Sequence, residues 1–402
     1  MKLWDDVSLA AKFLRFRVLS SCLTVLSVAL GVSLMIWLQN VTSGVREAFV
    51  QHATPYNLLV GGAGSPVQMV LSSLFYLDKP VGNISYDVYD NLKHDPSVER
   101  AVPIALGDSF RGVPVVGTTD EFFRPIPGEK FPLDIRSGKI FAGDFEVVVG
   151  ADAANRTSLS LGATFRTSHG LSGTLSHAAS FTVVGILAPT GGPRDRAIYC
   201  SLGSIQRVHQ EEPAATPEFG TGGAGEVTAV LIRPRQLTDL PLLQRKINMQ
   251  GRAQAIFPAA ALYQLFDMLD IWKKVIEVLC WIVVGVALTS ISITLYSFVE
   301  ERKDEIALLR ALGASRGRVI RFVLLQSELL AVGGALFGIL LGHLLMVVLG
   351  GFVRSFAGVE LSWKIYTGWE GIIFGILLAT GGLFGLLPAW KAYRVSVADH
   401  LA

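Results

Sequence analysis

The sequence has few charged residues and few cysteines, and each shortage excludes classes of protein. Only 17% of its 402 residues are Asp, Glu, Lys or Arg, whereas a soluble domain has about 25%. Three cysteines are too few for a disulfide scaffold or a cysteine-rich zinc module. With Lys+Arg 35 against Asp+Glu 33, the net charge of +2 excludes a nucleic-acid binder that relies on bulk basicity. The pattern GxxxxGK[ST] does not occur, so the sequence predicts no ATP hydrolysis by a P-loop.

Hydrophobic residues make up 51% of the chain, and many lie in four long stretches without Asp, Glu, Lys or Arg. A membrane-spanning helix needs roughly 20 apolar residues to cross a hydrocarbon core of about 30 Å, and each stretch is long enough. The stretches are residues 18–45, 278–299, 329–353 and 371–390. The first is too long for the apolar region of a cleavable signal peptide, so we interpret it as a retained signal anchor.

The distribution of basic residues over the short flanking segments predicts the orientation in the membrane. Segments 1–17, 300–321 and 391–402 carry 12 Lys and Arg in 51 positions, whereas residues 354–370 carry 2 in 17. Because short basic segments stay on the cytoplasmic side, both termini and residues 300–321 are predicted to be cytoplasmic. The long segment 46–274 is then exported.

The exported segment has the pattern of an independently folded α/β domain. Short β-branched runs bounded by Gly or Pro predict strands at 57–61, 145–150, 181–187 and 227–233. Apolar residues at helical spacing predict helices at 85–94 and 237–250, and a Pro/Gly/Thr-rich loop is predicted at 213–225. The predicted fold class is an α-helical integral membrane protein with four transmembrane helices plus a large α/β extracytoplasmic domain between helices 1 and 2.

These predictions divide the chain into consecutive segments. In order they are a cytoplasmic N-terminal segment (1–17), transmembrane helix 1 (18–45), the exported domain (46–274), transmembrane helix 2 (275–299), a cytoplasmic helix and loop (300–321), transmembrane helix 3 (322–353), a short external loop (354–370), transmembrane helix 4 (371–390) and a cytoplasmic tail (391–402).

Neither the cysteine nor the histidines of the exported domain have the spacing of a metal site. Cys200 is the only cysteine of this segment and follows a predicted strand, so we interpret it as a small core thiol rather than a reactive one. His169, His177 and His209 lack the ligand spacing of common zinc sites, so no bound metal is predicted.

Residues 300–314 form the most informative stretch of the sequence. Acidic residues at its start and Arg310 near its end suit the helix dipole, and Gly313 ends the pattern. Ile306, Leu309 and Leu312 are spaced three apart, which predicts an apolar ridge on a short, strongly charged helix. A solvated juxtamembrane helix needs no such ridge, whereas docking into the groove of a partner does.

The same stretch resembles the coupling segment of the FtsX/MacB/LolC-type ABC transporter permeases. The residues that carry the likeness are Glu301, Arg302, Glu305, Ile306, Leu309, Arg310, Leu312 and Gly313. Residues 23–32 resemble that family's first span, and residues 115–122 and 181–187 its extracytoplasmic domain. Pro388, Ala389 and Ala392 resemble its terminal P-A-x-x-A motif, while Ala307 and Val397 depart from the family pattern.

The resemblance implies a non-catalytic permease subunit of the mechanotransmission type (type VII) in a bacterial inner membrane. It implies two copies of a separate ABC ATPase subunit, which bind ATP and Mg, and no cofactor bound by this chain. A second permease copy is expected, in a homodimer or in a heterodimer with a sibling, and a periplasmic adaptor or lipoprotein is a further candidate partner. The exported domain would comprise a porter-like part, at about 46–110 and 226–270, and a β-rich insert at about 111–225.

Small and ionisable residues within the predicted spans add two expectations. Glycines spaced four apart let helices approach closely, and they are Gly334, Gly338, Gly342, Gly371, Gly375, Gly381 and Gly385. They predict either packing within the chain or a contact between two copies. Glu328 and His343 are ionisable residues in or near the third span, where such groups are functional candidates. Glu328 also suits the membrane interface, and His343 suits a hydrogen bond within the bundle.

Three functional classes follow from these observations. The first is ATP-driven export or extraction of a hydrophobic, lipidated or peptide substrate from the outer leaflet or periplasm. The second is a signalling relay that controls a cell-wall hydrolase or senses an antimicrobial peptide. The third, an enzyme on a membrane anchor, is the weakest because no GxSxG motif stands out in the exported domain. Residues 190–197 also resemble a segment of a bacterial subgroup linked to metal homeostasis, which makes such a permease a less favoured alternative.

Overall fold

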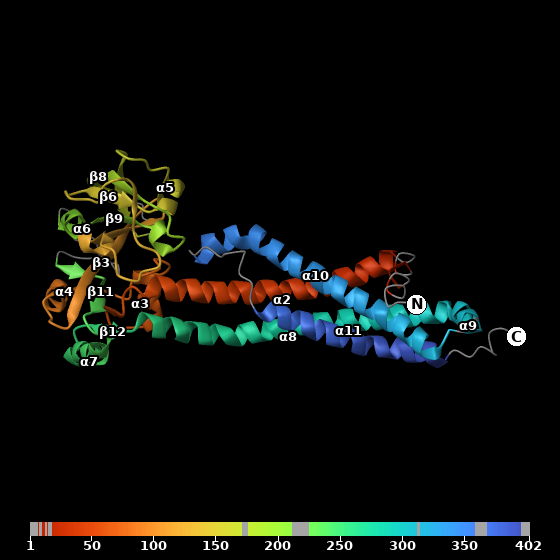
Figure 1. The fold of residues 1–402 in the computed structure, drawn as a ribbon. Coiled ribbons are helices and arrows are strands. Elements are labelled where there is room, and N and C mark those ends of the chain that lie inside the picture. Colours follow the sequence, from red (N-terminus) through yellow and green to blue (C-terminus); the bar gives the residue numbers. More distant parts are fainter. Residues whose placement is uncertain are drawn as a thin grey trace. The chain divides into compact units, whose positions relative to one another are not determined.

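The chain divides into two units, shown as a ribbon in Figure 1. The helical unit comprises residues 1–44, 270–352 and 361–402, and the α/β unit comprises residues 45–269 and 353–360. The computed structural model describes residues 7, 10–12, 14, 18–170, 176–210, 225–311, 314–357 and 368–394.

Four long helices make up most of the helical unit. They are α2 (Val18–Ala53), α8 (Pro258–Glu301), α10 (Arg316–Ala357) and α11 (Gly368–Arg394). Each is long and apolar enough to cross a membrane, which confirms the four predicted spans. Their outward faces carry exposed apolar side chains such as Leu19, Val286 and Leu387, which suit contact with lipid chains.

All four helices are longer than the predicted spans. Helix α2 continues beyond residue 45 to Ala53, and α8 begins at Pro258 rather than at residue 275. The predicted boundaries were set by the first charged residues, which end an apolar run but do not end a helix. The additional turns are stabilised by burial, because Phe49 stacks on Phe75 with ring centroids 4.3 Å apart and meets Phe266 edge-on at 5.9 Å.

A ten-stranded sheet forms the centre of the described α/β unit. Its strand order is β12-β1-β11-β3-β4-β9-β6-β8-β5, and β7 pairs with both β3 and β8. The strands are β1 (Leu58–Gly61), β3 (Val98–Phe110), β4 (Val113–Thr118), β5 (Ile135–Gly138), β6 (Glu146–Val149), β7 (Thr164–His169), β8 (Ser176–Leu187), β9 (Ile198–Ser201), β11 (Ala229–Pro234) and β12 (Gln254–Ile256). A separate pair joins β2 (Ile84–Ser85) to β10 (Glu226–Val227).

Strand β3 holds the two ends of this sheet together. Its first part pairs antiparallel with β11, in a register that runs from Val98↔Pro234 to Ile104↔Ala229. Its second part pairs with β4 and β7. The predicted division into a porter-like part and a β-rich insert stays a prediction. Strand β3 lies in the predicted porter-like part and pairs with strands of both parts.

Both faces of the sheet are covered, which explains why its strands read as apolar runs rather than as alternating patterns. Successive side chains of a strand point to opposite faces, so Val147 and Val149 lie in one core and Val148 in the other. The first core is covered by α4 (Tyr86–Lys93), α5 (Ala151–Thr157), α6 (Leu202–Gln210) and α7 (Leu240–Gln250). The second is covered by α3 (Pro66–Ser73) and by the ends of α2 and α8.

The predicted elements of this unit agree with the structure. The four predicted strands correspond to β1, β6, β8 and β11, and the two predicted helices to α4 and α7, which confirms the α/β class. Most of the predicted loop 213–225 lies outside the described residues. Cys200 is fully buried in β9, and burial raises the pKa of its thiol well above its usual value, as expected for a core thiol.

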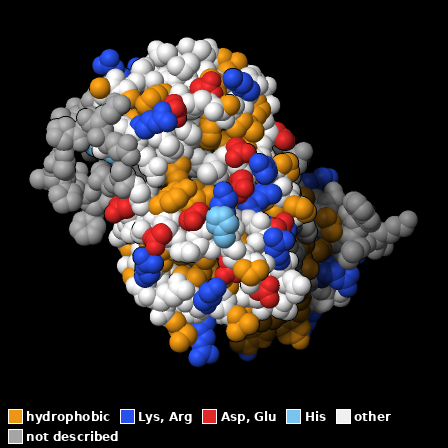
Figure 2. Space-filling view, turned by 90° about the vertical axis from the view of Figure 1, so that its left-hand side faces the viewer, with side chains coloured by type: hydrophobic (Ala, Val, Ile, Leu, Met, Phe, Trp, Pro, Cys, Tyr) orange, Lys and Arg blue, Asp and Glu red, His pale blue; other side chains and the backbone are white. Residues whose placement is uncertain are grey.

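One face of the molecule is shown in space-filling form in Figure 2. On this face, basic and acidic side chains are interspersed, with apolar side chains between them. Mixed charge of this kind gives no extended field of one sign.

Residues 190–196 form a hydrogen-bonded loop around buried charges. The carboxylate of Asp195 accepts hydrogen bonds from the N–H groups of Thr190 (2.9 Å) and Gly191 (2.8 Å) and from the Thr190 hydroxyl. Arg194 forms an ion pair with Glu129, and both side chains are less than a tenth exposed. The polar residues of this segment therefore have structural roles: they hold the loop in place and pair its buried charges.

We expect loss of the buried cation to destabilise the chain far more than loss of a surface one. Arg194→Ala leaves Glu129 buried without its partner, which costs roughly 3–5 kcal/mol. The control, Arg207→Ala, breaks the exposed pair with Asp144 and should cost about 0–1 kcal/mol. Thermal unfolding of the purified full chain measures both variants, and equal decreases in Tm would contradict the importance of the buried pair.

Candidate functional site

Helix α9 (Lys303–Ala311) occupies the segment that the sequence predicts to dock on a partner. It follows α8 almost directly, and the N–H of Ile306 donates to the carbonyl of Arg302 at 3.0 Å across the join. Arg302 also forms an ion pair with Glu305 at 2.8 Å. Glu301 is the last residue of α8, and Arg310 lies in the last turn of α9. The predicted short, charged helix is therefore present.

The apolar residues of α9 are divided between the interior of the helical unit and its surface. Ile306 is only 9% exposed and belongs to the core of the helical unit. The prediction that it faces a partner is corrected, because it packs on other helices of its own chain. Leu308 is 52% exposed and occupies the surface position. The side chain of Leu309 and the residues Leu312 and Gly313 lie outside the described part of the chain.

The C-terminal ends of α8 and α11 are joined by an ion pair and by a contact between a cation and an aromatic ring. Lys391 of α11 forms an ion pair with Glu300 of α8. Its Nζ also lies 3.5 Å from the centroid of the Tyr296 ring. Ala389 and Ala392, from the predicted P-A-x-x-A motif, are at most 1% exposed. This motif therefore serves close packing of α11 against the neighbouring helices.

Three of the predicted packing glycines bring α10 against α2. A Cβ added at Gly334, Gly338 or Gly342 would lie 3.0 Å or less from a side chain of α2. The side chains met in this way are Val28, Val32 and Ile36. Contact within the chain therefore accounts for this glycine repeat.

The four predicted glycines of α11 fall into two pairs. A Cβ at Gly381 or Gly385 would lie 2.7 Å from Ala331 or Ser327 of α10, so this pair also serves packing within the chain. Gly371 and Gly375 occupy exposed positions, and no other group lies within 4 Å of a Cβ at Gly375. A contact between two copies stays a prediction for these two glycines alone.

The two predicted ionisable residues of α10 have different surroundings. His343 Nε2 lies 3.1 Å from Oε1 of Glu370, which is 3% exposed at the start of α11. Sequence reasoning missed Glu370 because it lies just before the apolar stretch. Glu328 lines an open groove between α10 and α11 with Leu324, Leu378 and other apolar residues. Among the described residues, no hydrogen-bond partner is present for its Oε2.

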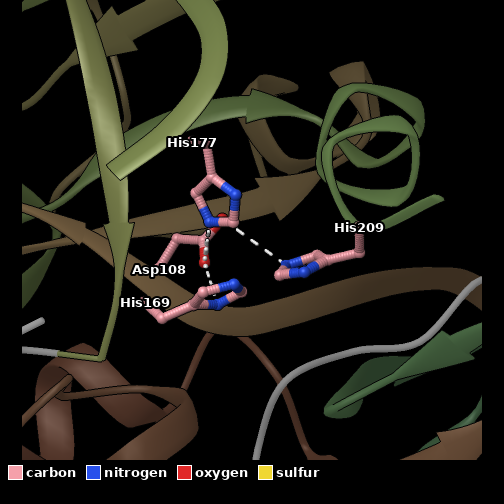
Figure 3. Close-up of side chains that lie close together, drawn as sticks. All are labelled: Asp108, His169, His177 and His209. Carbon is pink, nitrogen blue, oxygen red and sulfur yellow. Dashed lines mark hydrogen bonds and ion pairs between the residues drawn. The ribbon is translucent and has the colours of Figure 1, made fainter. Parts of the chain in front are cut away.

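The histidines that sequence spacing did not connect lie together in the structure. His169, His177 and His209 surround the carboxylate of Asp108, a residue that the sequence did not mark as a candidate ligand (Figure 3). Spacing along the chain detects ligands that lie in one loop or helix. These four residues belong to three strands and one helix, so no local spacing could have revealed them.

Comparison with known protein families agrees with both units. The model of the MacB-like periplasmic core domain matches residues 21–249, and that of the FtsX-like permease C-terminal region matches residues 278–397. The chain belongs to the FtsX/MacB/LolC-type family of ABC transporter permeases. It is thus an integral protein of the inner membrane, with an α/β periplasmic domain between its first helix and the later helices.

Three relatives show how far this likeness extends. The chain is 22% identical over 99% of its length to the macrolide export ATP-binding/permease protein MacB of Rhodopirellula baltica, of which the match covers 62%. It is 23% identical over 96% of its length to the lipoprotein-releasing system transmembrane protein LolC of Haemophilus influenzae, covering 94% of that protein. The uncharacterized ABC transporter permease YknZ of Bacillus subtilis is 36% identical over 26% of this chain, and the match covers 24% of YknZ. The chain therefore spans less than two thirds of the length of the MacB and YknZ relatives.

The glycine contacts of α10 predict that adding one methyl group lowers stability at a packed glycine but not at one without a close neighbour. Gly338→Ala places a Cβ 2.6 Å from Cβ of Val32, and such overpacking costs about 1–3 kcal/mol. Gly350→Ala, on the same helix, has no neighbour within 4 Å and should be neutral or slightly stabilising, because alanine favours helix formation. Tm of the detergent-solubilised chain measures both variants. A Gly338→Ala chain as stable as the Gly350→Ala chain would argue against close contact between α2 and α10.

Proposed function

We propose that this permease couples ATP hydrolysis on a separate ATPase subunit to movement of its periplasmic α/β unit. The observation that carries the proposal is that α2 and α8 each take part in two cores. Val28 of α2 and Val284 of α8 lie in the core of the helical unit. Phe49 and Phe266 of the same two helices lie in a core of the α/β unit. Displacement of either helix therefore acts on both cores, which supports mechanotransmission.

The interior of the helical unit supports transmission of force rather than passage of a polar substrate. Its main core cluster consists of apolar side chains. Scattered buried polar residues lie among them on all four long helices: Thr24, Ser33, Gln39, Asn40, Ser292, Gln326, Ser327 and Glu370. The hydroxyls of Ser292 and Ser327 donate to the carbonyls of Phe384 and Gly381, so they satisfy their hydrogen-bonding capacity within the unit. We therefore place substrate recognition in the periplasmic α/β unit.

The substrate proposed is a hydrophobic, lipidated or peptide molecule taken from the outer leaflet or the periplasm. One relative is named for macrolide export and another for lipoprotein release, and both names describe movement away from the membrane or cell. These names support the class of substrate and direction of movement.

The proposed assembly contains two permease copies and two ATPase subunits, with ATP and Mg bound by the ATPases. Helix α9 would dock on the ATPase through exposed Leu308, surrounded by the charged residues Glu301, Glu305 and Arg310. Buried apolar centres dominate the energies of protein interfaces, whereas exposed ion pairs contribute about 0–1 kcal/mol. The apolar contact should therefore carry most of the binding. A sibling permease in place of the second copy would make the pair a heterodimer.

The proposed orientation places α9 and both termini in the cytoplasm. In a chain without native cysteines, Thr238→Cys of the α/β unit should react with a membrane-impermeant thiol reagent in intact cells with a permeable outer membrane. Gly317→Cys, at the start of α10, should react only after the inner membrane is opened. Both positions are exposed, so accessibility within the fold does not separate them. Labelling of both residues in intact cells would refute the orientation.

The docking role of α9 predicts that one apolar residue matters more than the charges around it. Leu308→Asp should release the ATPase or abolish its coupling, because a carboxylate enters an apolar groove without a partner. Glu301→Ala should retain the complex. Co-purification, native mass and ATPase activity in reconstituted membranes measure both variants, with an expected complex of two permeases and two ATPases. If Leu308→Asp retains its partner and its hydrolysis rate, α9 is a linker rather than a docking helix.

A further inference from the structure

Four side chains from separate parts of the α/β unit converge on one point (Figure 3). Asp108 lies near the end of β3, His169 ends β7, His177 is near the start of β8, and His209 lies in the last turn of α6. One potential ligand atom from each of them lies within 4.8 Å of those from the other three. Among the described residues, these four side chains form the group of His, Cys, Asp and Glu residues close enough together to hold a metal ion.

The distances around Asp108 resemble those between the ligands of a tetrahedral metal ion. His177 Nε2 lies 3.2 Å and His169 Nδ1 lies 3.5 Å from Oδ1 of Asp108. His209 Nε2 lies 3.5 Å from the other carboxylate oxygen, Oδ2. Ligands placed about 2.0–2.1 Å from a tetrahedral zinc ion are roughly 3.3 Å from one another. The distances from each imidazole to the carboxylate are thus close to the separation that a central ion requires.

The cluster is well enclosed and contains a carboxylate anion. The side chain of Asp108 is fully buried, those of His177 and His209 are 1% and 8% exposed, and that of His169 is 21% exposed. The group therefore offers one carboxylate oxygen and three imidazole nitrogens as ligands.

Hydrogen bonds within the cluster do not account for all of these groups. His209 Nε2 and Asp108 Oδ2 are buried and lie 3.5 Å from each other, at the limit of a hydrogen bond, and neither makes a closer hydrogen bond among the described residues. A buried polar atom without a partner costs about 1–3 kcal/mol. The ring centroids of His177 and His169 also lie only 4.1 Å apart. A cation at the centre would give the buried atoms of Asp108 and His209 a partner.

We propose that Asp108, His169, His177 and His209 together bind one zinc ion. Zinc accepts imidazole nitrogen and carboxylate oxygen in a tetrahedral arrangement. Imidazole-rich sites favour zinc and other late transition metals over magnesium and calcium, which prefer oxygen ligands. Four protein ligands fill the tetrahedron and leave no position for a reacting water. The site is therefore structural or regulatory rather than catalytic.

Local features of the fold position the four ligands. A register shift in the β3–β4 pairing lies immediately before Asp108, and a bulge of this kind turns a side chain toward a site. Gly117 of β4 allows α6 to approach the sheet, because a Cβ there would lie 2.8 Å from Ile205. The bound ion would join α6 and the β7–β8 hairpin to β3, the strand shared by both ends of the sheet. Zinc binding should therefore stabilise the α/β unit.

The experiment uses the full-length chain, purified in detergent, treated with EDTA and then titrated separately with Zn²⁺ and Co²⁺. We expect about one zinc per chain by elemental analysis after excess metal is removed, and a higher Tm with Zn²⁺ than without it. Co²⁺ should give the visible absorption bands of a tetrahedral site, and Zn²⁺ should abolish them. None of these measurements depends on ATPase coupling.

Two ligand variants and a matched control assign the site. His177→Gln and Asp108→Asn should each weaken zinc binding by more than about 100-fold, because loss of even an outer-shell partner costs 10- to 100-fold. His94→Gln changes an exposed histidine that pairs with Asp90, and it should bind zinc like the parent chain. Retention of the cobalt bands by both ligand variants would overturn the assignment. A parent chain that takes up neither zinc nor cobalt in stoichiometric amount would overturn the proposal without any variant.

Discussion

The ten-stranded sheet of the α/β unit is covered by apolar side chains on both faces, and the ends of α2 and α8 cover part of one face. Leu59 and Val148 of the sheet share a core with Phe49 of α2 and Phe266 of α8. Burying such a side chain contributes roughly 1.5–3 kcal/mol. The hydrophobic effect that stabilises the sheet therefore also fixes the ends of these two helices against it. Two of the helices that cross the membrane are in this way also components of the periplasmic domain, which is why we place force transmission in α2 and α8.

Within the membrane, lipid chains are as apolar as leucine side chains, so helices associate through close fit and a few polar contacts. The glycines of α10 provide that fit against α2, as the short distance from Gly338 to Val32 illustrates. The polar contacts join neighbouring helices, such as the pair formed by His343 of α10 and Glu370 of α11. The same helices expose apolar side chains on their outer faces. A close-packed interior with isolated polar pairs suits helices that move together rather than a channel lined by polar groups.

The spans and the main strands could be predicted because each depends on a property of a continuous stretch. Membrane spans need uninterrupted apolar length, and strands buried on both faces appear as short β-branched runs, as at Val147–Val149. The direction of Ile306 could not be predicted, because spacing identifies the apolar side of α9 but not the element that covers it. The cluster around Asp108 was also beyond sequence reasoning, since it depends on which strands are neighbours in the sheet. Pairing of β3 with β7 sets Asp108 opposite His169, and no periodicity along the chain contains that information.

The position of this cluster bears on how movement would reach a substrate. Helix α6, which carries His209, covers the face of the sheet opposite to the one that packs against α2 and α8. A zinc ion there would join α6, β3 and the β7–β8 hairpin without contacting either transmitting helix. A sheet that is cross-linked in this way deforms less when a helix on its other face is displaced. The α/β unit would then follow α2 and α8 as one body, so force applied at the helices would move the recognition surface instead of being lost in distortion of the sheet. A closed four-ligand site suits this role, because catalytic zinc sites keep a position for water, whereas bracing a sheet requires only that all four ligands remain bound.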